Sequence, residues 1–388
     1  MGAPSSFSRY VLWILLAFSA AAVASISLQN LVWVAIAVFL FQKLRNRQAP
    51  EWPRGLFPAA TLVFLATFFL AAFTGIDPAN SFQTVHKYLT FLLLFPLGAM
   101  AFSLEATRKL LLAFVAGASF CALAGIGKHF YLHQDRIDSF SGDKMVFGGM
   151  LMVSLLLLLF FLKDSPRNPW FWAALPLLGA ALVFTQTRGA WIGFTAGLFL
   201  WSWRLGRKWF LTALLALAAA FFLLPRPFQE RIKSIADLKL SYDAGGQIQN
   251  SSQERVLIWV GGMKVVRDYP WGVGQGNLSE IYPKYKVPEA TETTVPHLHN
   301  DFLQILVQNG WVGLAAYLFW IFSYYWTAWR REPADAEGGN LNWAFLCVFS
   351  AVLVWGLTEY TFSHQFMNIQ FFMLGLQECL WTGSSKRG

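Results

Sequence analysis

The sequence predicts an all-α integral membrane protein with about twelve transmembrane helices. Its 388 residues are 56% hydrophobic, 17% aromatic and only 13% charged, a composition too apolar for an ordinary soluble protein. Apolar stretches of roughly 17 to 25 residues, enough to cross a hydrocarbon core of ~30 Å, recur along the chain. These stretches are continuous blocks of Leu, Phe and Ala without the alternation of a membrane β-barrel, so helices are favoured.

The expected spans follow one another with short polar connections, apart from one long polar interval near residues 226–300. The first span could be mistaken for a cleaved signal peptide, but the spans that follow it make a retained helix the simpler interpretation. In chain order we expect spans at 9–26, 28–42, 56–74, 88–103, 108–127, 146–162, 169–186, 189–203, 208–224, 311–329, 341–360 and 365–381.

The distribution of Lys and Arg predicts the orientation in the membrane. With a cytoplasmic N-terminus, the inner loops and the tail hold most of the Lys and Arg, as the positive-inside rule requires, and both termini lie in the cytoplasm. The net charge of +9 is then largely a topological bias. It gives no support to nucleic-acid binding, and no nucleic acid is expected as a partner.

Three sections of the chain follow from this layout: residues 1–225 with the first nine spans, 226–310 as a long outer loop, and 311–388 with three spans and a cytoplasmic tail. Within the loop, a capping box of Ser251 and Glu254 and a stop at Pro270 predict a helix over about 252–268.

One face of that expected helix carries Val256, Trp259, Met263 and Val266, so we expect it to lie on the membrane surface. Glycines 272, 274 and 276 follow it. They do not fit a dinucleotide fingerprint, because they follow a helix and no βαβ unit is possible, and we interpret them as a tight turn.

A polar cluster lies directly before the tenth expected span, in "TVPHLHNDFLQILVQNGWVGL". Asn300 or Asp301 can cap a short helix, and Asp301 and Gln304 stand at capping-box spacing. Asn309 and Gly310 predict the end of this helix, before a span that starts at Trp311. His299 would then lie at the amino end of a helix, where backbone N–H groups and the helix dipole favour an anion.

Two arginines are expected on the same outer face as His299. Arg188 lies in "TQTRGAWIG", between two spans, and Arg255 lies on the first turn of the surface helix. Each alone suits a lipid anchor or a solvated charge, but together they supply two bidentate phosphate ligands beside one titratable group. His86 and Lys87 share this side and suit interfacial anchors as well as ligands. Glu359 and His364, in the last outer loop, are weaker candidates.

No metal or other cofactor is expected. His297 and His299 with Glu289 or Glu292 could form part of a zinc site, but the spacing lacks a characteristic third and fourth ligand. The chain has no Asp-x-Asp pair, and its three cysteines lie in apolar spans without paired spacing, which argues for neither a disulfide nor a metal site.

The stretch "HNDFLQILVQNGWVGL", preceded by "RVLIWVGGMKVVRDYPWGVGQGN" and earlier by "TRGAWIG", resembles the O-antigen ligase and polymerase superfamily of bacterial envelope enzymes. The resemblance implies a C-type glycosyltransferase fold in the bacterial inner membrane, with a periplasmic loop between helices 9 and 10. It implies transfer of a glycan from undecaprenyl pyrophosphate to an acceptor hydroxyl on the periplasmic side. In the ligase branch, the acceptor is a sugar of the lipid A core.

By the same resemblance, Arg188 and Arg255 match the arginines that hold the donor pyrophosphate, and His299 matches the essential histidine. His299 could act as a general base or orient the acceptor hydroxyl. Asn300, Trp259, His86 and Lys87 are the expected substrate-binding residues. We expect metal-independent transfer with inversion at the anomeric carbon, since no carboxylate nucleophile is evident.

Alternatives remain within and outside the superfamily. A polymerase would use a second lipid-linked glycan as acceptor, and an oligosaccharyltransferase would use a protein. From a different class, twelve helices with both ends inside also suit a secondary transporter. The spans are nearly free of charged residues and the polar residues gather at the outer face, which favours the enzyme.

Overall fold

The chain forms an all-helical molecule, as the apolar pattern predicts. The structure is a computed structural model and describes residues 6–138, 140, 142–234, 251–331 and 336–384; every regular element among them is a helix. Six of these helices are long and apolar enough to cross a membrane, which indicates a multi-pass membrane protein. The expected number of twelve spans is not reached by this criterion. The six are Ser27–Arg45, Leu56–Thr74, Leu104–Leu132, Lys144–Asp164, Asp301–Arg330 and Glu337–Trp355.

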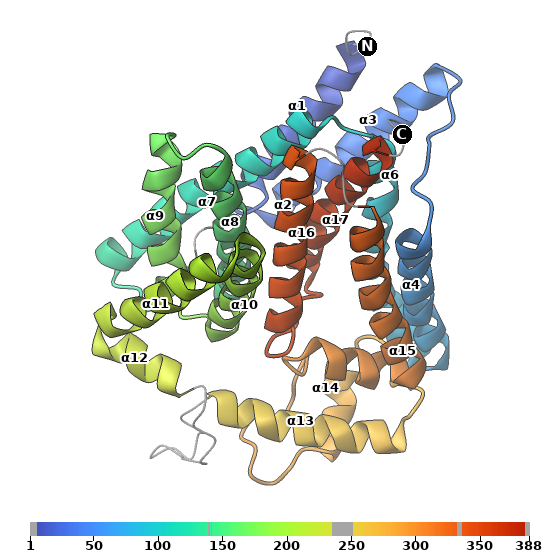
Figure 1. Cartoon of the computed structure of the whole chain (residues 1–388). Helices are drawn as coiled ribbons and strands as arrows, with labels where there is room; N and C mark the ends of the chain where they lie inside the picture. The colour runs from blue at the N-terminus through green and yellow to red at the C-terminus, as the bar shows by residue number, and fades with distance from the viewer. Residues whose placement is uncertain (1–5, 139, 141, 235–250, 332–335, 385–388) are drawn as a thin grey trace.

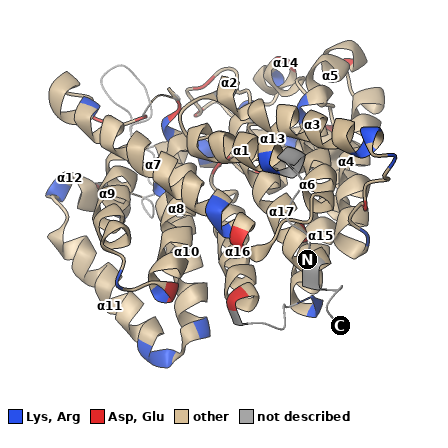
Figure 2. Ribbon diagram, turned by 90° about the horizontal axis from the view of Figure 1, so that it is seen from above, with Lys and Arg blue, Asp and Glu red and all other residues tan. Residues whose placement is uncertain are grey.

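The first helices follow the expected spans closely. They are α1 (Ser6–Ala21), α2 (Ile26–Gln29), α3 (Leu31–Arg45) and α4 (Leu56–Thr74). Helix α1 packs on α3 and α7, and α4 packs on α15. Most helix bodies in Figure 2 carry neither Lys and Arg nor Asp and Glu, which gather at the ends and connections, as a lipid environment requires.

The expected span at 88–103 is wrong as a single helix. The chain forms α5 (Pro78–Val85), a 3₁₀ segment η1 (His86–Leu93) and the short α6 (Leu94–Ala99). Pro96 lies inside α6, has no N–H to donate to the preceding turn and clashes with its carbonyl, so a long α-helix is interrupted here. The apolar residues of η1 that prompted the prediction are buried against the bundle.

The middle of the chain supplies α7 (Leu104–Leu132), α8 (Lys144–Asp164), α9 (Pro169–Thr185), α10 (Arg188–Leu205), α11 (Arg207–Leu223) and α12 (Arg226–Lys233). Helix α8 is the most buried candidate span. By contrast, α11 is apolar and Ala213 is its one buried residue, so most of its surface is not covered by the other described helices.

Close packing of α10 on α16 fixes the position of Arg188, the first residue of α10. Gly189, Gly193 and Gly197 recur every four residues and therefore share one face. A Cβ at Gly193 would lie 2.6 Å from the Ala351 carbonyl oxygen, and one at Gly189 would lie 2.7 Å from Trp355. Small residues at such positions let two membrane helices approach closely.

The remaining elements build the side that carries the polar cluster. They are α13 (Ser251–Asp268), α14 (Leu278–Ile281), η2 (Tyr282–Lys284), α15 (Asp301–Arg330), α16 (Ala336–Trp355) and α17 (His364–Ser384). Figure 1 shows α13 lying across the lower ends of the bundle, on the opposite side from the start of α1 and the end of α17. The helix expected over 252–268 is therefore confirmed.

The expected apolar stripe of α13 does not form one exposed face. Met263 is exposed and Val256 and Trp259 are partly buried, whereas Val266 is buried in the cluster that α13 shares with α15. Glu254 also differs from its expected capping role. Its carboxylate accepts hydrogen bonds from the Thr291 and Glu292 backbone N–H groups, so it fastens the segment before the histidines to α13.

The expected stop at Asn309 and Gly310 is confirmed, because α15 breaks at Gly310, where φ is 67° and ψ is −168°. A left-handed φ of this kind favours glycine. The glycine turn packs against this break: a Cβ at Gly272 would lie 2.4 Å from the Gln308 carbonyl oxygen. Gly272, Gly274 and Gly276 all have positive φ, so the tight turn is confirmed.

Candidate active site

The backbone around His299 is fixed from both sides. Asn300 caps α15, its side chain accepting a hydrogen bond from the Leu303 N–H at 3.0 Å, as a helix N-cap requires. His299 adopts φ 50°, a left-handed conformation that costs about 1 kcal/mol for a non-glycine residue. The Leu298 N–H donates to Gln304, and the Leu298 carbonyl accepts from the Trp259 indole at 2.7 Å. These contacts hold His299 in its conformation.

Asp301 fastens the start of α15 to the loop that follows α16. Its N–H donates to the Gly356 carbonyl at 2.7 Å, and its carboxylate accepts from the Thr361 N–H at 2.8 Å and from the Thr361 hydroxyl. Asn300 adds a hydrogen bond to the Leu357 carbonyl. We call these contacts of Asn300 and Asp301 with residues 356–361 the loop clasp. Glu359 lies between its two points of attachment.

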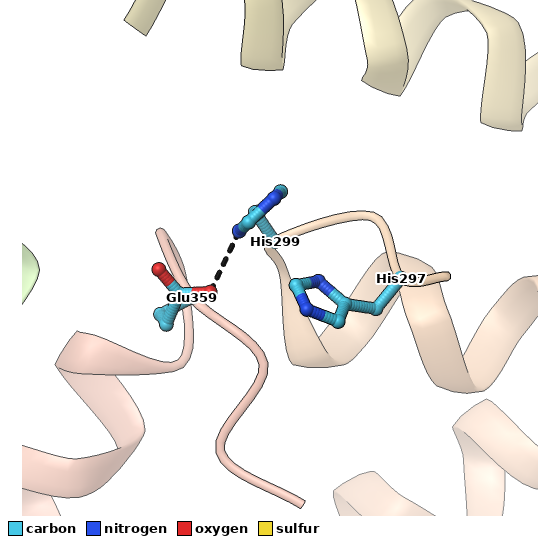
Figure 3. Close-up of side chains that lie close together, drawn as sticks. All are labelled: His297, His299 and Glu359. Atoms are coloured by element: carbon cyan, nitrogen blue, oxygen red, sulfur yellow. Dashed lines mark hydrogen bonds and ion pairs between the residues drawn. The ribbon is translucent and has the colours of Figure 1, made fainter. Parts of the chain in front are cut away.

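Glu359 joins His299 to Arg255, as Figure 3 shows for the histidine. One carboxylate oxygen lies 2.6 Å from His299 Nδ1, and the other accepts from the Arg255 guanidinium at 2.8 Å. The Glu359 side chain is 6% exposed, Arg255 14% and His299 23%. A largely buried carboxylate thus links two side chains that lie far apart in the sequence.

The surroundings of Glu359 keep its carboxylate ionised. Burial by itself raises the pKa of Glu359, but the hydrogen bond from His299 and the charges of His299 and Arg255 outweigh burial and lower the pKa below its ordinary value. An ionised carboxylate can only accept hydrogen bonds. His299 Nδ1 therefore carries the proton in this pair, and Nε2 is the ring nitrogen that Glu359 does not engage.

His297 lies beside His299 but in a different environment. Its ring meets the His299 ring edge to face at a centroid distance of 4.3 Å and stacks on Tyr360. Burial and the neighbouring His299 lower the pKa of His297 to about 4, so its ring is neutral at pH 7. Its Nδ1 has no hydrogen-bond partner among the described residues.

Arg188 reaches the same region from α10. Its guanidinium donates to the hydroxyls of Ser234, at 2.7 Å, and Ser251, at 2.5 Å, and the residue is 7% exposed. Ser251 and Arg255 stand four residues apart on α13 and therefore share one face. The structure thus attaches Arg188 to Ser251, which lies one helical turn before Arg255 on α13.

His86 and Lys87 are not joined to the Arg255, Glu359 and His299 group. Both are exposed on η1, and within the described ranges no hydrogen bond or ion pair links them to the site. The next residue, Tyr88, is the one that reaches it: its hydroxyl lies 2.8 Å from that of Tyr360. Trp259 and Asn300 lie at the site, where both contact the protein backbone.

A metal ion could take ligands from His297, His299 and Glu359, whose donor atoms lie within 4.8 Å of one another. The carboxylate differs from the two that the sequence suggested, Glu289 and Glu292. Arg255 opposes such an ion, because its guanidinium already binds the same carboxylate and places a positive charge beside the cation's position.

Glu359 is the main residue that sequence reasoning ranked too low. In the sequence, Glu359 is marked only by its position in an outer loop, in "EYTFSHQ". No motif spacing connects it with His299. Sixty positions separate the two residues, and only the packing of α15 beside α16 and the loop clasp bring them together. The side chain of His364, the other candidate in that loop, lies outside the described residues.

The segment that holds both arginines and His299 is similar to a known protein family. A family model described as O-antigen ligase matches residues 172–318. Residues 172–318 are therefore similar to the O-antigen ligase family. The matched segment holds Arg188, Arg255 and His299, whereas Glu359 lies beyond it. The family match confirms the resemblance that the sequence motifs indicate.

A curated relative gives a second, weaker similarity. The chain is 27% identical over 227 residues to a general O-oligosaccharyltransferase of Acinetobacter baylyi (strain ATCC 33305 / BD413 / ADP1). The alignment covers 55% of this chain and 38% of that relative, so the chain matches well under half of the relative's length.

Proposed function

We propose that this protein is an O-antigen ligase, which transfers a glycan from undecaprenyl pyrophosphate to a sugar hydroxyl of the lipid A core. The proposal places the protein in the bacterial inner membrane with both termini in the cytoplasm and the site on the periplasmic face. The observation that carries it is the buried Glu359 carboxylate, which pairs His299 with Arg255 in a chain whose residues 172–318 match the O-antigen ligase family model.

Arg188 and Arg255 suit the donor pyrophosphate. The contact with Glu359 uses one N–H group of Arg255, and a guanidinium carries five. As the bond between the anomeric carbon and the pyrophosphate oxygen breaks, negative charge builds on the leaving group. Fixed guanidinium groups in a partly dehydrated site stabilise that charge more in the transition state than in the ground state.

His299 suits the acceptor hydroxyl. Glu359 holds the proton on Nδ1, so Nε2 can accept the proton of the acceptor hydroxyl as its oxygen attacks the anomeric carbon. The carbon–oxygen bond to undecaprenyl pyrophosphate breaks in the same displacement, and the pyrophosphate leaves as an anion. A single displacement inverts the anomeric configuration. Retention in the product, or a covalent glycosyl-enzyme, would exclude this mechanism.

A second candidate function follows from the similarity to the general O-oligosaccharyltransferase. That function would use the same donor and the same Arg255, Glu359 and His299 group, with a protein hydroxyl as acceptor. The acceptor therefore distinguishes the two candidates, because the chemistry at the anomeric carbon is common to both.

The deciding experiment supplies purified, reconstituted protein with lipid-linked glycan alone, with added lipid A core, and with an added acceptor protein. Mass spectrometry identifies the product of each incubation. We expect a glycan joined to lipid A core in the second incubation alone. Elongated lipid-linked glycan in the first incubation would indicate a polymerase, and a glycosylated protein in the third would indicate an oligosaccharyltransferase.

A further inference from the structure

The exposed side of α13 contains a shallow hollow that the proposed chemistry leaves unused. Its volume is about 450 Å³. Val260 and Met263 are 45% and 49% exposed there, and the cations Lys264 and Arg267 lie on the exposed side of the same helix. The lining consists of Val256, Trp259, Val260, Met263, Lys264 and Arg267. An apolar surface with a few charged groups is typical of a ligand site.

The hollow lies beside the candidate active site along α13. Val256 directly follows Arg255, and the Trp259 indole that lines the hollow donates to the carbonyl of Leu298, the residue before His299. With a rise of 1.5 Å per residue, twelve residues of α13 place Arg267 about 18 Å from Arg255 along the helix. A molecule in the hollow could therefore reach His299 with one end and the two cations with the other.

The position of the hollow next to His299, through the contact of Trp259 with Leu298, favours the acceptor as occupant. The donor pyrophosphate is assigned to Arg188 and Arg255, and the acceptor must bring its hydroxyl to His299. Lys264 and Arg267 form no ion pair with any described residue. Two such cations side by side on one helix attract an anionic group.

We propose that this hollow binds the acceptor glycan and that Lys264 and Arg267 bind phosphate groups that the acceptor carries away from its reacting hydroxyl. The inference rests on the proposed ligase function and adds the class of acceptor, a phosphorylated glycan. Trp259, Val260 and Met263 supply the apolar surface for the sugar rings, and the two cations select for phosphate.

The test measures binding, so that it does not depend on turnover. Deacylated, phosphorylated core oligosaccharide is titrated into the protein in nanodiscs of phosphatidylcholine, and the same oligosaccharide is titrated after its phosphates have been removed. The variant is Lys264→Gln with Arg267→Gln. The matched control is Lys284→Gln with Lys286→Gln, which removes two charges from another part of the same outer segment.

We expect the phosphorylated form to bind about 3- to 10-fold more tightly than the dephosphorylated form, as two exposed charge contacts imply. The double variant should lose this preference, and the control should keep it. Equal binding of both forms by the unaltered protein, or a preference that survives in the double variant, would overturn the inference. The inference would also be overturned if the double variant lost binding to phosphatidylglycerol vesicles but kept binding to the oligosaccharide. Lys264 and Arg267 would then bind membrane lipid.

Kinetics separate this inference from the proposed function. In the transfer assay, the double variant should raise the KM for the acceptor by a similar factor while the KM for the donor stays the same. A protein that binds the phosphorylated oligosaccharide through Lys264 and Arg267 but transfers no glycan would contradict the ligase function alone. Transfer with an unaltered acceptor KM would contradict the acceptor site alone.

Discussion

The carboxylate of Glu359 accepts a hydrogen bond from His299 Nδ1 at 2.6 Å, although 60 residues separate the two along the chain. The same carboxylate binds Arg255, so one buried group fixes both the ring orientation of the proposed base and a proposed phosphate ligand. In catalytic triads and metal sites, a carboxylate that is hydrogen-bonded to one ring nitrogen likewise sets the tautomer of a histidine.

Replacing Glu359 with Gln should strongly reduce transfer. The amide removes the negative charge that holds the Nδ1 proton and can donate to Nδ1 instead, which favours the wrong tautomer of His299. We expect kcat to fall about 10²-fold or more, within the range of general base contributions. The measurement is the initial rate of transfer to lipid A core. Glu280→Gln, an exposed glutamate of the same outer segment, is the control; an equal loss in both variants would point to a general defect.

Arg188→Lys and Arg255→Lys should each lose most activity while keeping the positive charge. An ammonium group cannot make the planar, bidentate contact with phosphate that a guanidinium makes. We expect weaker donor binding and at least a 10-fold lower kcat/KM for the donor. Arg226→Lys, at an exposed position of α12, is the matched control. Near-normal turnover in both variants would assign these arginines to lipid anchoring.

Asp301→Ala should displace Glu359 by opening the loop clasp. The change leaves the N–H and hydroxyl of Thr361 without their buried acceptor, at a cost of about 1–3 kcal/mol in stability. Asp301→Asn keeps one oxygen acceptor and should recover part of the activity. Thermal unfolding and initial rates are measured together. Full activity in Asp301→Ala would show that the clasp does not position the carboxylate.

His297 should make the protein less stable in acid. Its pKa is about 4 in the folded protein against an ordinary value of 6.5, so the unfolded chain binds the proton more readily between these values. Stability from this group is therefore present above pH 6.5 and is lost as the pH falls toward 4, by ~3 kcal/mol. His297→Gln should reduce the change in the free energy of unfolding between pH 6.5 and pH 4. An unchanged curve would contradict the assigned environment.

Chelation should leave transfer unchanged. The Arg255 guanidinium stands beside the carboxylate that a metal would need, and the proposed mechanism stabilises the leaving group with arginines. Initial rates are compared before and after treatment with EDTA, followed by re-addition of divalent ions. A loss on chelation that the ions restore would assign a metal to His297, His299 and Glu359.

Much of the fold follows from local sequence. Long apolar runs predict helices such as α4, α8 and α9 almost to the residue, because length and composition alone specify a membrane helix. Gly310 and Pro270 mark breaks through their backbone chemistry. The segment over 88–103 shows where this reasoning fails. Its hydropathy is that of a span, but Pro96 and the docking of α5 give a 3₁₀ segment and a short helix.

The site could be predicted only in part, for a similar reason. Arg188, Arg255 and His299 lie in recognisable motifs, so their gathering on one face could be expected from the order of the spans. The partnership with Glu359 depends on the contact of Asp301 with Gly356 and Thr361. That contact is set by tertiary packing between α15 and the end of α16, which no local pattern encodes.

In the proposed mechanism, the His299 and Glu359 pair activates the acceptor for glycan transfer to lipid A core. The most direct test is a single-turnover reaction with reconstituted protein, lipid-linked glycan and lipid A core, comparing the unaltered protein with His299→Ala after donor binding has been verified in both. We expect a glycan–core product with the unaltered protein and a rate at least about 10²-fold lower with His299→Ala. Product formation at an equal rate in the two proteins would contradict it.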